Sequence, residues 1–189
     1  MSFIIAAAGL FYATPVSVVT QSAQSTSGSR ITLYFENATL TTSTTPTVNT
    51  ATSQPTGPVG STTIARGSTK YLYSPVFTSS LSVPAGNWVV DLWASSVIAA
   101  TRMTVAIYIV NSAGKVVSTV NGGTSTPPIR GIPSEVAVTL SGAAVTIPAG
   151  DYIQVAFTAP KGGASPSFTV YWGSAQPTNF QVTLPAGVR

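Results

Sequence analysis

The fold class follows from a succession of short runs rich in β-branched and aromatic residues, each bounded by Gly, Pro, Asn or Ser. Such runs, separated by turn residues, are typical of antiparallel strands. No stretch beyond residue 30 repeats its apolar residues with the 3.6-residue period of a helix, and the abundance of Ser, Thr and Val disfavours helix. The pattern predicts strands at 30–40, 62–64, 70–77, 88–94, 102–110, 116–120, 135–140, 152–158, 167–172 and 180–184.

Residues 31–189 are therefore predicted to form one all-β domain, a jelly-roll or Greek-key β-sandwich. An immunoglobulin-like sandwich is the alternative. The clearest hairpin turn is Asn111-Ser-Ala-Gly114, because Asn and Gly tolerate the backbone conformations that tight turns require.

One short motif occurs twice in full. Leu81-Ser-Val-Pro-Ala-Gly-Asn-Trp88 is matched in order and chemistry by Val145-Thr-Ile-Pro-Ala-Gly-Asp-Tyr152, and Leu184-Pro-Ala-Gly187 repeats the turn alone. Pro fixes one turn residue, Gly permits positive φ, and Asn or Asp bonds to its neighbours before an aromatic residue enters the next strand. The motif predicts a strand-entry turn that the fold reuses.

The N-terminal stretch is apolar and carries no charge between residues 3 and 19. The basic segment with which a signal peptide begins is missing here, and a membrane helix would be short and broken by Pro15. A long buried strand is the favoured interpretation. The chain then divides into an apolar arm at 1–20, a polar linker at 21–30 and the sandwich at 31–189. The large apolar residues of the arm are Phe3, Ile4, Ile5, Leu10, Phe11, Val16, Val18 and Val19.

Charge and residue types narrow the function. Only 6% of residues are charged, and the eight cations are dispersed along the sequence, which argues against nucleic-acid binding. His and Cys are absent, so neither a Ser-His-Asp nor a Cys-His arrangement can form within this chain. These observations predict a protein that is not an enzyme and holds no cofactor.

Acids and aromatics give no clear site. The only acids are Glu36, Asp91, Glu135 and Asp151, too dispersed in sequence to predict a metal site or a catalytic pair. The aromatic residues are expected in the core or at a subunit interface, with a carbohydrate-stacking platform as the alternative. Asn37 begins the one Asn-X-Thr sequon and is a glycan acceptor if the chain is secreted.

Several runs resemble a known family. They are Ile31-Thr-Leu-Tyr-Phe-Glu-Asn37, Tyr71-Leu-Tyr-Ser-Pro75, the turn at 83–88, and Val170-Tyr-Trp-Gly-Ser-Ala-Gln-Pro-Thr-Asn-Phe-Gln181. Together they look like secreted jelly-roll domains of archaeal and bacterial surface proteins. With the arm in front, the chain resembles subunits of extracellular archaeal pili assembled by donor-strand exchange.

That resemblance implies an extracellular homopolymer in which the arm of each subunit completes the sandwich of the next, with a role in adhesion and biofilms. We therefore expect a structural pilus subunit at the cell surface, with no nucleic-acid partner and no stable membrane span in its mature form. The alternatives are a carbohydrate-binding or adhesive surface module, a type IV pilin-like subunit with a helical core, and a viral jelly-roll coat protein.

Overall fold

The computed structural model describes residues 30–34, 40–46, 60–98, 100–162, 167–172 and 181–188. Within these ranges no helix is long and apolar enough to span a membrane. The described residues form strands β1 Thr32–Tyr34, β2 Gly60–Ile64, β3 Thr69–Tyr73, β4 Leu81–Val83, β5 Gly86–Ser96, β6 Thr104–Val110, β7 Val116–Ser125, β8 Ser134–Gly142, β9 Val145–Ile147, β10 Tyr152–Thr158, β11 Phe168–Trp172 and β12 Gln181–Thr183.

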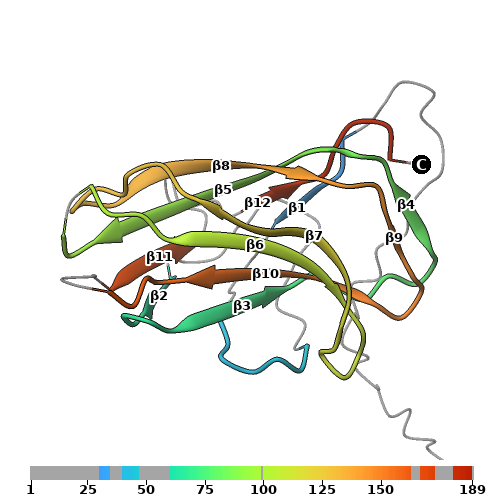
Figure 1. Cartoon of the computed structure of the whole chain (residues 1–189), viewed down its shortest axis with the longest axis horizontal. Helices are drawn as coiled ribbons and strands as arrows, with labels where there is room; N and C mark the ends of the chain where they lie inside the picture. The colour runs from blue at the N-terminus through green and yellow to red at the C-terminus, as the bar shows by residue number, and fades with distance from the viewer. Residues whose placement is uncertain are drawn as a thin grey trace, which may run out of the picture.

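The strands build two antiparallel sheets and one small pair (Figure 1). In the larger sheet β5 is central: β8 pairs along one edge, while β12 and β11 pair in succession along the other. β1 extends this sheet beyond β12, and β2 extends it beyond β11. The second sheet has the order β3-β10-β6-β7, and β4 pairs with β9.

Alternation along each strand places the core between the two sheets. In β5, Trp88, Val90 and Leu92 are fully buried while the residues between them are half-exposed. In the second sheet the facing residues are Val105, Ile107 and Ile109 of β6 with Ile153, Val155 and Phe157 of β10. Because the two faces share one apolar cluster, the domain is a β-sandwich.

The copies of the repeated motif contact one another in the folded chain. β4 and β9, the first three residues of each full copy, pair with each other, and Leu81 lies opposite Ile147. Gly150 and Gly187 have positive φ, whereas Gly86 is needed for a different reason: a Cβ there would lie 2.9 Å from the ring of Pro185 in the third copy. The prediction of a strand-entry turn holds for the two full copies, where β5 and β10 begin, whereas the third copy leads into no strand among the described residues. The pairing of β4 with β9 was not predicted from the sequence.

Residues 40–46 lie against the second sheet from outside. Thr41 forms a bridge to Tyr71, and the Tyr73 hydroxyl donates to the carbonyl of Ser43 at 2.9 Å. The same hydroxyl accepts from Nε2 of Gln154 at 2.8 Å, and Gln154 is 3% exposed. This buried relay ties the segment to β3 and β10.

The all-β prediction is confirmed, although the strand order does not single out a jelly roll. Most predicted strands are present within a few residues, and the Asn111 side chain caps its hairpin by accepting from the backbone N–H groups of Ala113 and Lys115. β4 and β9 were not predicted. The arm at 1–20 and nearly all of the linker at 21–30 lie outside the described residues.

Gly142 provides a test of core packing. Trp88 is 0% exposed and its indole N–H has no hydrogen-bond partner within the described part of the chain, so the ring depends on packing. A Cβ at Gly142 would lie 2.8 Å from the indole and from Val120. We expect Gly142→Ala to lower the free energy of unfolding by about 1–3 kcal/mol in urea titrations. Gly122→Ala, where the nearest atom is 4.0 Å from the added Cβ, should have little effect; equal losses would contradict this account.

Tyr73 makes stability depend on alkaline pH. Burial raises the pKa of its phenol above 10.0, Tyr71 adds to the rise, and the hydrogen bond from Gln154 opposes it. As pH rises past 10, the unfolded chain loses the proton first, so the free energy of unfolding falls. Tyr73→Phe should cost about 1–3 kcal/mol at neutral pH by leaving the buried Gln154 amide without its acceptor, and should weaken the alkaline fall. Tyr71→Phe is the matched control in urea titrations at pH 8 and pH 11.

Candidate functional site

Four loops meet at one end of the sandwich. Phe168 pairs with both Ile64 and Ser96, Thr158 pairs with both Thr69 and Thr104, and Thr104 also pairs with Ser125. These registers align the ends of β2, β5, β7 and β10 with the starts of the strands that follow them. The loops are residues 65–68, 97–103 without residue 99, 126–133 and 159–162, at the left of Figure 1. We call this the loop end.

The β5–β6 and β7–β8 loops lie side by side and are joined by backbone hydrogen bonds. Ser96 N–H donates to the carbonyl of Arg130 at 2.8 Å, and Ala100 N–H donates to that of Ile129 at 2.9 Å. Ile129 N–H returns a bond to the carbonyl of Thr101 at 2.7 Å. The two loops therefore behave as one continuous ledge.

Hydroxyl groups fix the tip of the β5–β6 loop. Thr101 Oγ1 donates to the carbonyl of Ile98 at 2.8 Å, and the buried Ser96 hydroxyl donates to Thr101 Oγ1 at 2.9 Å. Ser96 Oγ also accepts from the N–H of Ile98 at 3.3 Å. Ala100 has a φ of 62°, a left-handed conformation that is uncommon for a residue with a Cβ. Both backbone groups of Ile98 are thus held in a strained, defined turn.

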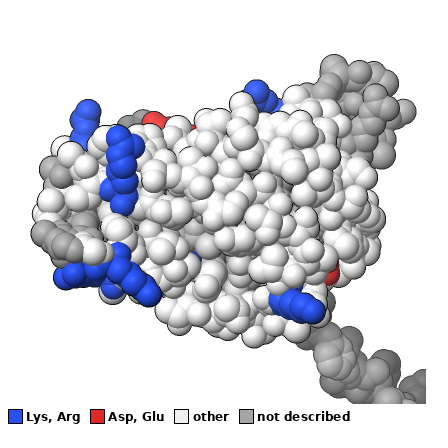
Figure 2. All heavy atoms as spheres, viewed as in Figure 1, with Lys and Arg blue, Asp and Glu red and all other residues white. Residues whose placement is uncertain are grey.

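Cationic side chains gather at the loop end, as Figure 2 shows at its left side. Of the seven described Lys and Arg residues, the four carried by these loops are Arg66, Arg102, Arg130 and Lys161, all exposed. Arg66 donates from Nε and Nη2 to the carbonyl of Lys161, which joins the β2–β3 and β10–β11 loops. The cations, which are dispersed along the sequence, are therefore clustered in the folded chain.

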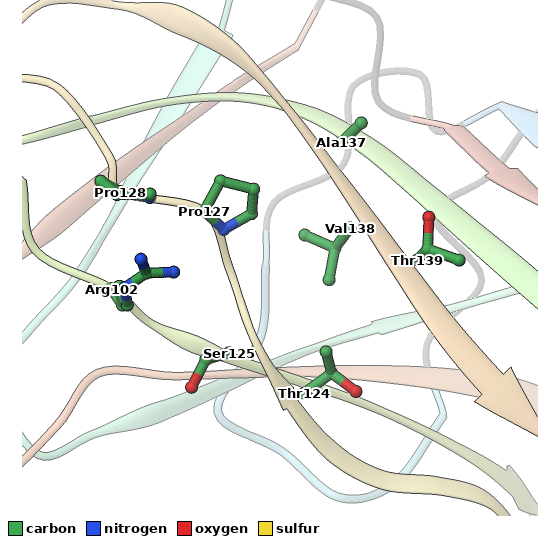
Figure 3. Close-up of a pocket in the computed structure, with 8 residues that line it drawn as sticks. All are labelled: Arg102, Thr124, Ser125, Pro127, Pro128, Ala137, Val138 and Thr139. Carbon is green, nitrogen blue, oxygen red and sulfur yellow. The ribbon is translucent and has the colours of Figure 1, made fainter.

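A shallow hollow of about 400 Å³ lies beside this ledge (Figure 3). Its lining comes from the end of β7, the middle of β8 and the β5–β6 and β7–β8 loops: Arg102, Thr124, Ser125, Pro127, Pro128, Ala137, Val138 and Thr139. Nη1 of Arg102 donates to the carbonyl of Thr126 at 2.7 Å. The rest of its guanidinium stays available to a carboxylate or phosphate, next to apolar and hydroxyl groups.

Two of the described acids are neighbours and the third lies apart: in the β5–β8 register Asp91 is opposite Ala137, two residues from Glu135. Asp91 is half-buried in the middle of β5, Glu135 is exposed near the start of β8, and Asp151 is buried at the opposite end of the sandwich. Within the described ranges no three acidic, His or Cys residues come close enough together to hold a metal ion. β5 is the central strand of the larger sheet, so Asp91 does not lie on a sheet edge.

The aromatic residues follow the core prediction in part. Tyr73, Trp88 and Trp172 are buried, whereas Tyr71, Trp93, Tyr108, Tyr152 and Tyr171 are half-buried. The donor-strand residues Phe3, Ile4, Ile5, Leu10, Phe11, Val16, Val18 and Val19 lie outside the described residues, as does the sequon residue Asn37. Their predicted roles remain predictions.

Solved structures share this fold. No protein-family model and no curated protein matches the chain. A CocE/NonD family hydrolase from Staphylococcus aureus superposes with a TM-score of 0.63 at 10% identity, over 85% of this chain and 37% of its own. An aminopeptidase from a marine sediment archaeon, Thaumarchaeota archaeon, gives 0.62 at 10% identity over 84% and 37%. An α-amino acid ester hydrolase gives 0.55 at 12% identity over 82% and 36%.

These neighbours correct the expected function. They are hydrolases rather than filament subunits, which contradicts the expected pilus subunit with its roles in adhesion and biofilms. The expectation that the chain is not an enzyme is contradicted on the same ground. The likeness, at these identities, is one of fold, and the chain spans little more than a third of each hydrolase.

The β5–β6 turn can be tested directly. Thr101→Val keeps the shape of the side chain but removes the donor to Ile98, and net loss of such a bond costs about 0.5–1.5 kcal/mol. We expect amide hydrogen exchange around Ile98 to quicken by up to about tenfold while the core amides are unchanged. Thr139→Val on the exposed face of β8 is the control. Unchanged exchange around Ile98 would show that the hydroxyl network does not hold the turn.

Proposed function

We propose that this chain is the β-sandwich unit of a hydrolase, working beside a catalytic unit that lies on a further stretch of the same polypeptide or on a partner polypeptide. The observation that carries this proposal is the extent of the likeness: most of the chain superposes on one limited part of each of several hydrolases. A fold shared in this way fits a modular unit.

The residue inventory supports the division of labour. Ester and peptide hydrolysis needs an activated nucleophile or a metal-bound water. With no His and no Cys in the sequence, the chain does not itself contain the imidazole or thiolate that most such sites use. Among the described acids, Asp91 and Glu135 are diagonal neighbours across β5 and β8, but no third acidic residue joins them and Asp151 lies at the opposite end of the sandwich. The catalytic groups are therefore assigned to the second unit, and the sandwich supports or positions it.

The substrate class we propose is an ester or amide of an α-amino acid. Two of the neighbours, the aminopeptidase and the α-amino acid ester hydrolase, carry that chemistry in their names. The hollow beside Arg102 adds a guanidinium that could meet a carboxylate on the acyl or leaving group.

The test is to capture the protein from its source cells with an antibody against residues 60–98 and to assay the captured material. Leucine p-nitrophenyl ester and leucine p-nitroanilide serve as substrates. We expect hydrolysis that exceeds a control in which the antibody is first saturated with recombinant chain. Mass spectrometry of the captured material should find a catalytic sequence either joined to this chain or stoichiometric with it.

Two results would contradict the proposal. Captured material that contains the chain but hydrolyses neither substrate would remove the hydrolase assignment. Hydrolysis by the purified recombinant 189-residue chain alone would place the chemistry in this chain and overturn the division of labour.

A further inference from the structure

The loop end exposes aliphatic side chains that the core would normally hold. Val97 is 77% exposed, Ile132 is 66% exposed and Ile98 is 42% exposed. They occur on the two loops that backbone hydrogen bonds join, so they form one group rather than isolated surface residues. The other two large exposed aliphatic residues of the described chain, Val116 and Val117, lie at the opposite end of β7.

The structure fixes this group in its exposed position. A flexible loop could fold its Val and Ile side chains back onto the body and remove apolar surface from water. Here the hydroxyls of Ser96 and Thr101 hold both backbone groups of Ile98, and the left-handed Ala100 sets the turn. A surface that inserts into an apolar phase or binds a partner benefits from apolar side chains that are already held in place, because ordering them on binding costs free energy. Backbone strain can be retained where it serves such a function.

The charge around these residues has one dominant sign. Arg66, Arg102, Arg130 and Lys161 contribute +4, and Glu135 near the start of β8 contributes −1, which leaves +3 among the described residues at this end. The β2–β3 loop begins two strands away from the β5–β6 loop, or about 10 Å at ordinary strand spacing. The cations therefore spread across the whole end instead of converging on one point.

A second copy of the chain offers no matching surface among the described residues. Asp151 is buried, Asp91 is half-buried in mid-strand, and Glu135 already belongs to the cationic end. A broad cationic rim around protruding aliphatic residues instead matches a plane that is anionic at its surface and apolar just beneath it. An anionic lipid bilayer has both properties.

We propose that the loop end docks peripherally on anionic lipid membranes. Val97, Ile98 and Ile132 enter the boundary between headgroups and acyl chains. Arg66, Arg130 and Lys161 meet lipid phosphates and carboxylates, and Arg102 adds to the positive potential of the loop end. This inference does not depend on the proposed hydrolase role, since the membrane contact uses the loop tips and requires no catalytic unit.

The test is flotation of the full chain with vesicles of phosphatidylcholine alone and with 30% phosphatidylserine. The dissociation constant for the anionic vesicles should be at least about 25-fold lower than for the neutral ones, because each cation contributes about fivefold, and 0.5 M NaCl should remove most of the difference. The double variant Arg130→Gln/Lys161→Gln should raise the dissociation constant for the anionic vesicles roughly 25-fold, at about fivefold per cation. Val97→Ser/Ile132→Ser should raise it roughly tenfold by removing apolar burial.

Matched variants separate the loop end from the rest of the chain. Arg30→Gln/Lys115→Gln removes two cations elsewhere, and Val116→Ser/Val117→Ser removes two exposed aliphatic residues at the far end. Both should bind anionic vesicles within about twofold of the unmodified chain. Thermal unfolding of every variant checks that the sandwich is intact.

Three results would overturn the proposal. The first is no vesicle binding. The second is equal binding to neutral and anionic vesicles that the loop variants leave unchanged, which would assign the interaction to the apolar residues 3–19. The third is capture on poly-glutamate beads without vesicle binding, which would make the loop end a docking surface for an acidic protein.

Discussion

The arrangement of the sandwich depends on β5, which pairs with β8 along one of its edges and with β12 and β11 along the other. Its side chains alternate between core and exterior over eleven residues, so a shift by one position would expose Trp88, Val90 and Leu92. β8 pairs with nine of these residues on one edge, and β12 and β11 share the other edge. The register of β5 therefore sets the positions of both sheet edges and brings Ser96, where the β5–β6 loop starts, to the loop end.

The loop end shows how a rigid β-sandwich can carry function in its connections. The sheets need only apolar alternation and backbone pairing, which leaves the loops free to vary in length and chemistry. Here one loop contains a left-handed Ala100 and exposed aliphatic residues, and it follows directly on the buried Ser96 at the end of β5. Such a combination stabilises the fold poorly, and strain of this kind persists where it serves an interaction. The likeness to hydrolases concerns the sandwich, and the distinctive chemistry of this chain lies in its loops.

Local sequence pattern predicted the fold class well because each strand carries its own signal. The runs at 152–158 and 116–120 alternate or cluster β-branched residues, and Asn111-Ser-Ala-Gly114 contains the turn chemistry that its hairpin uses. β4 and β9 escaped prediction because each has only three residues and is stabilised by pairing with the other. The predicted function was wrong because it was inferred from composition and from the resemblance of short runs to a family. Neither of these determines which solved structures share the fold of this chain.

Two properties were already decided in the linear chain: an all-β fold, and the absence of His and Cys, which follows from residue identity alone. The candidate site is different. Arg66, Arg102, Arg130 and Lys161 are far apart in sequence, and no local pattern relates them. They share one end because antiparallel pairing, with β11 in one sheet and β6 in the other, aligns the ends of β2, β5, β7 and β10 that precede their loops. Pairing is a long-range interaction between backbones, so only the tertiary structure could bring these cations beside Val97 and Ile132.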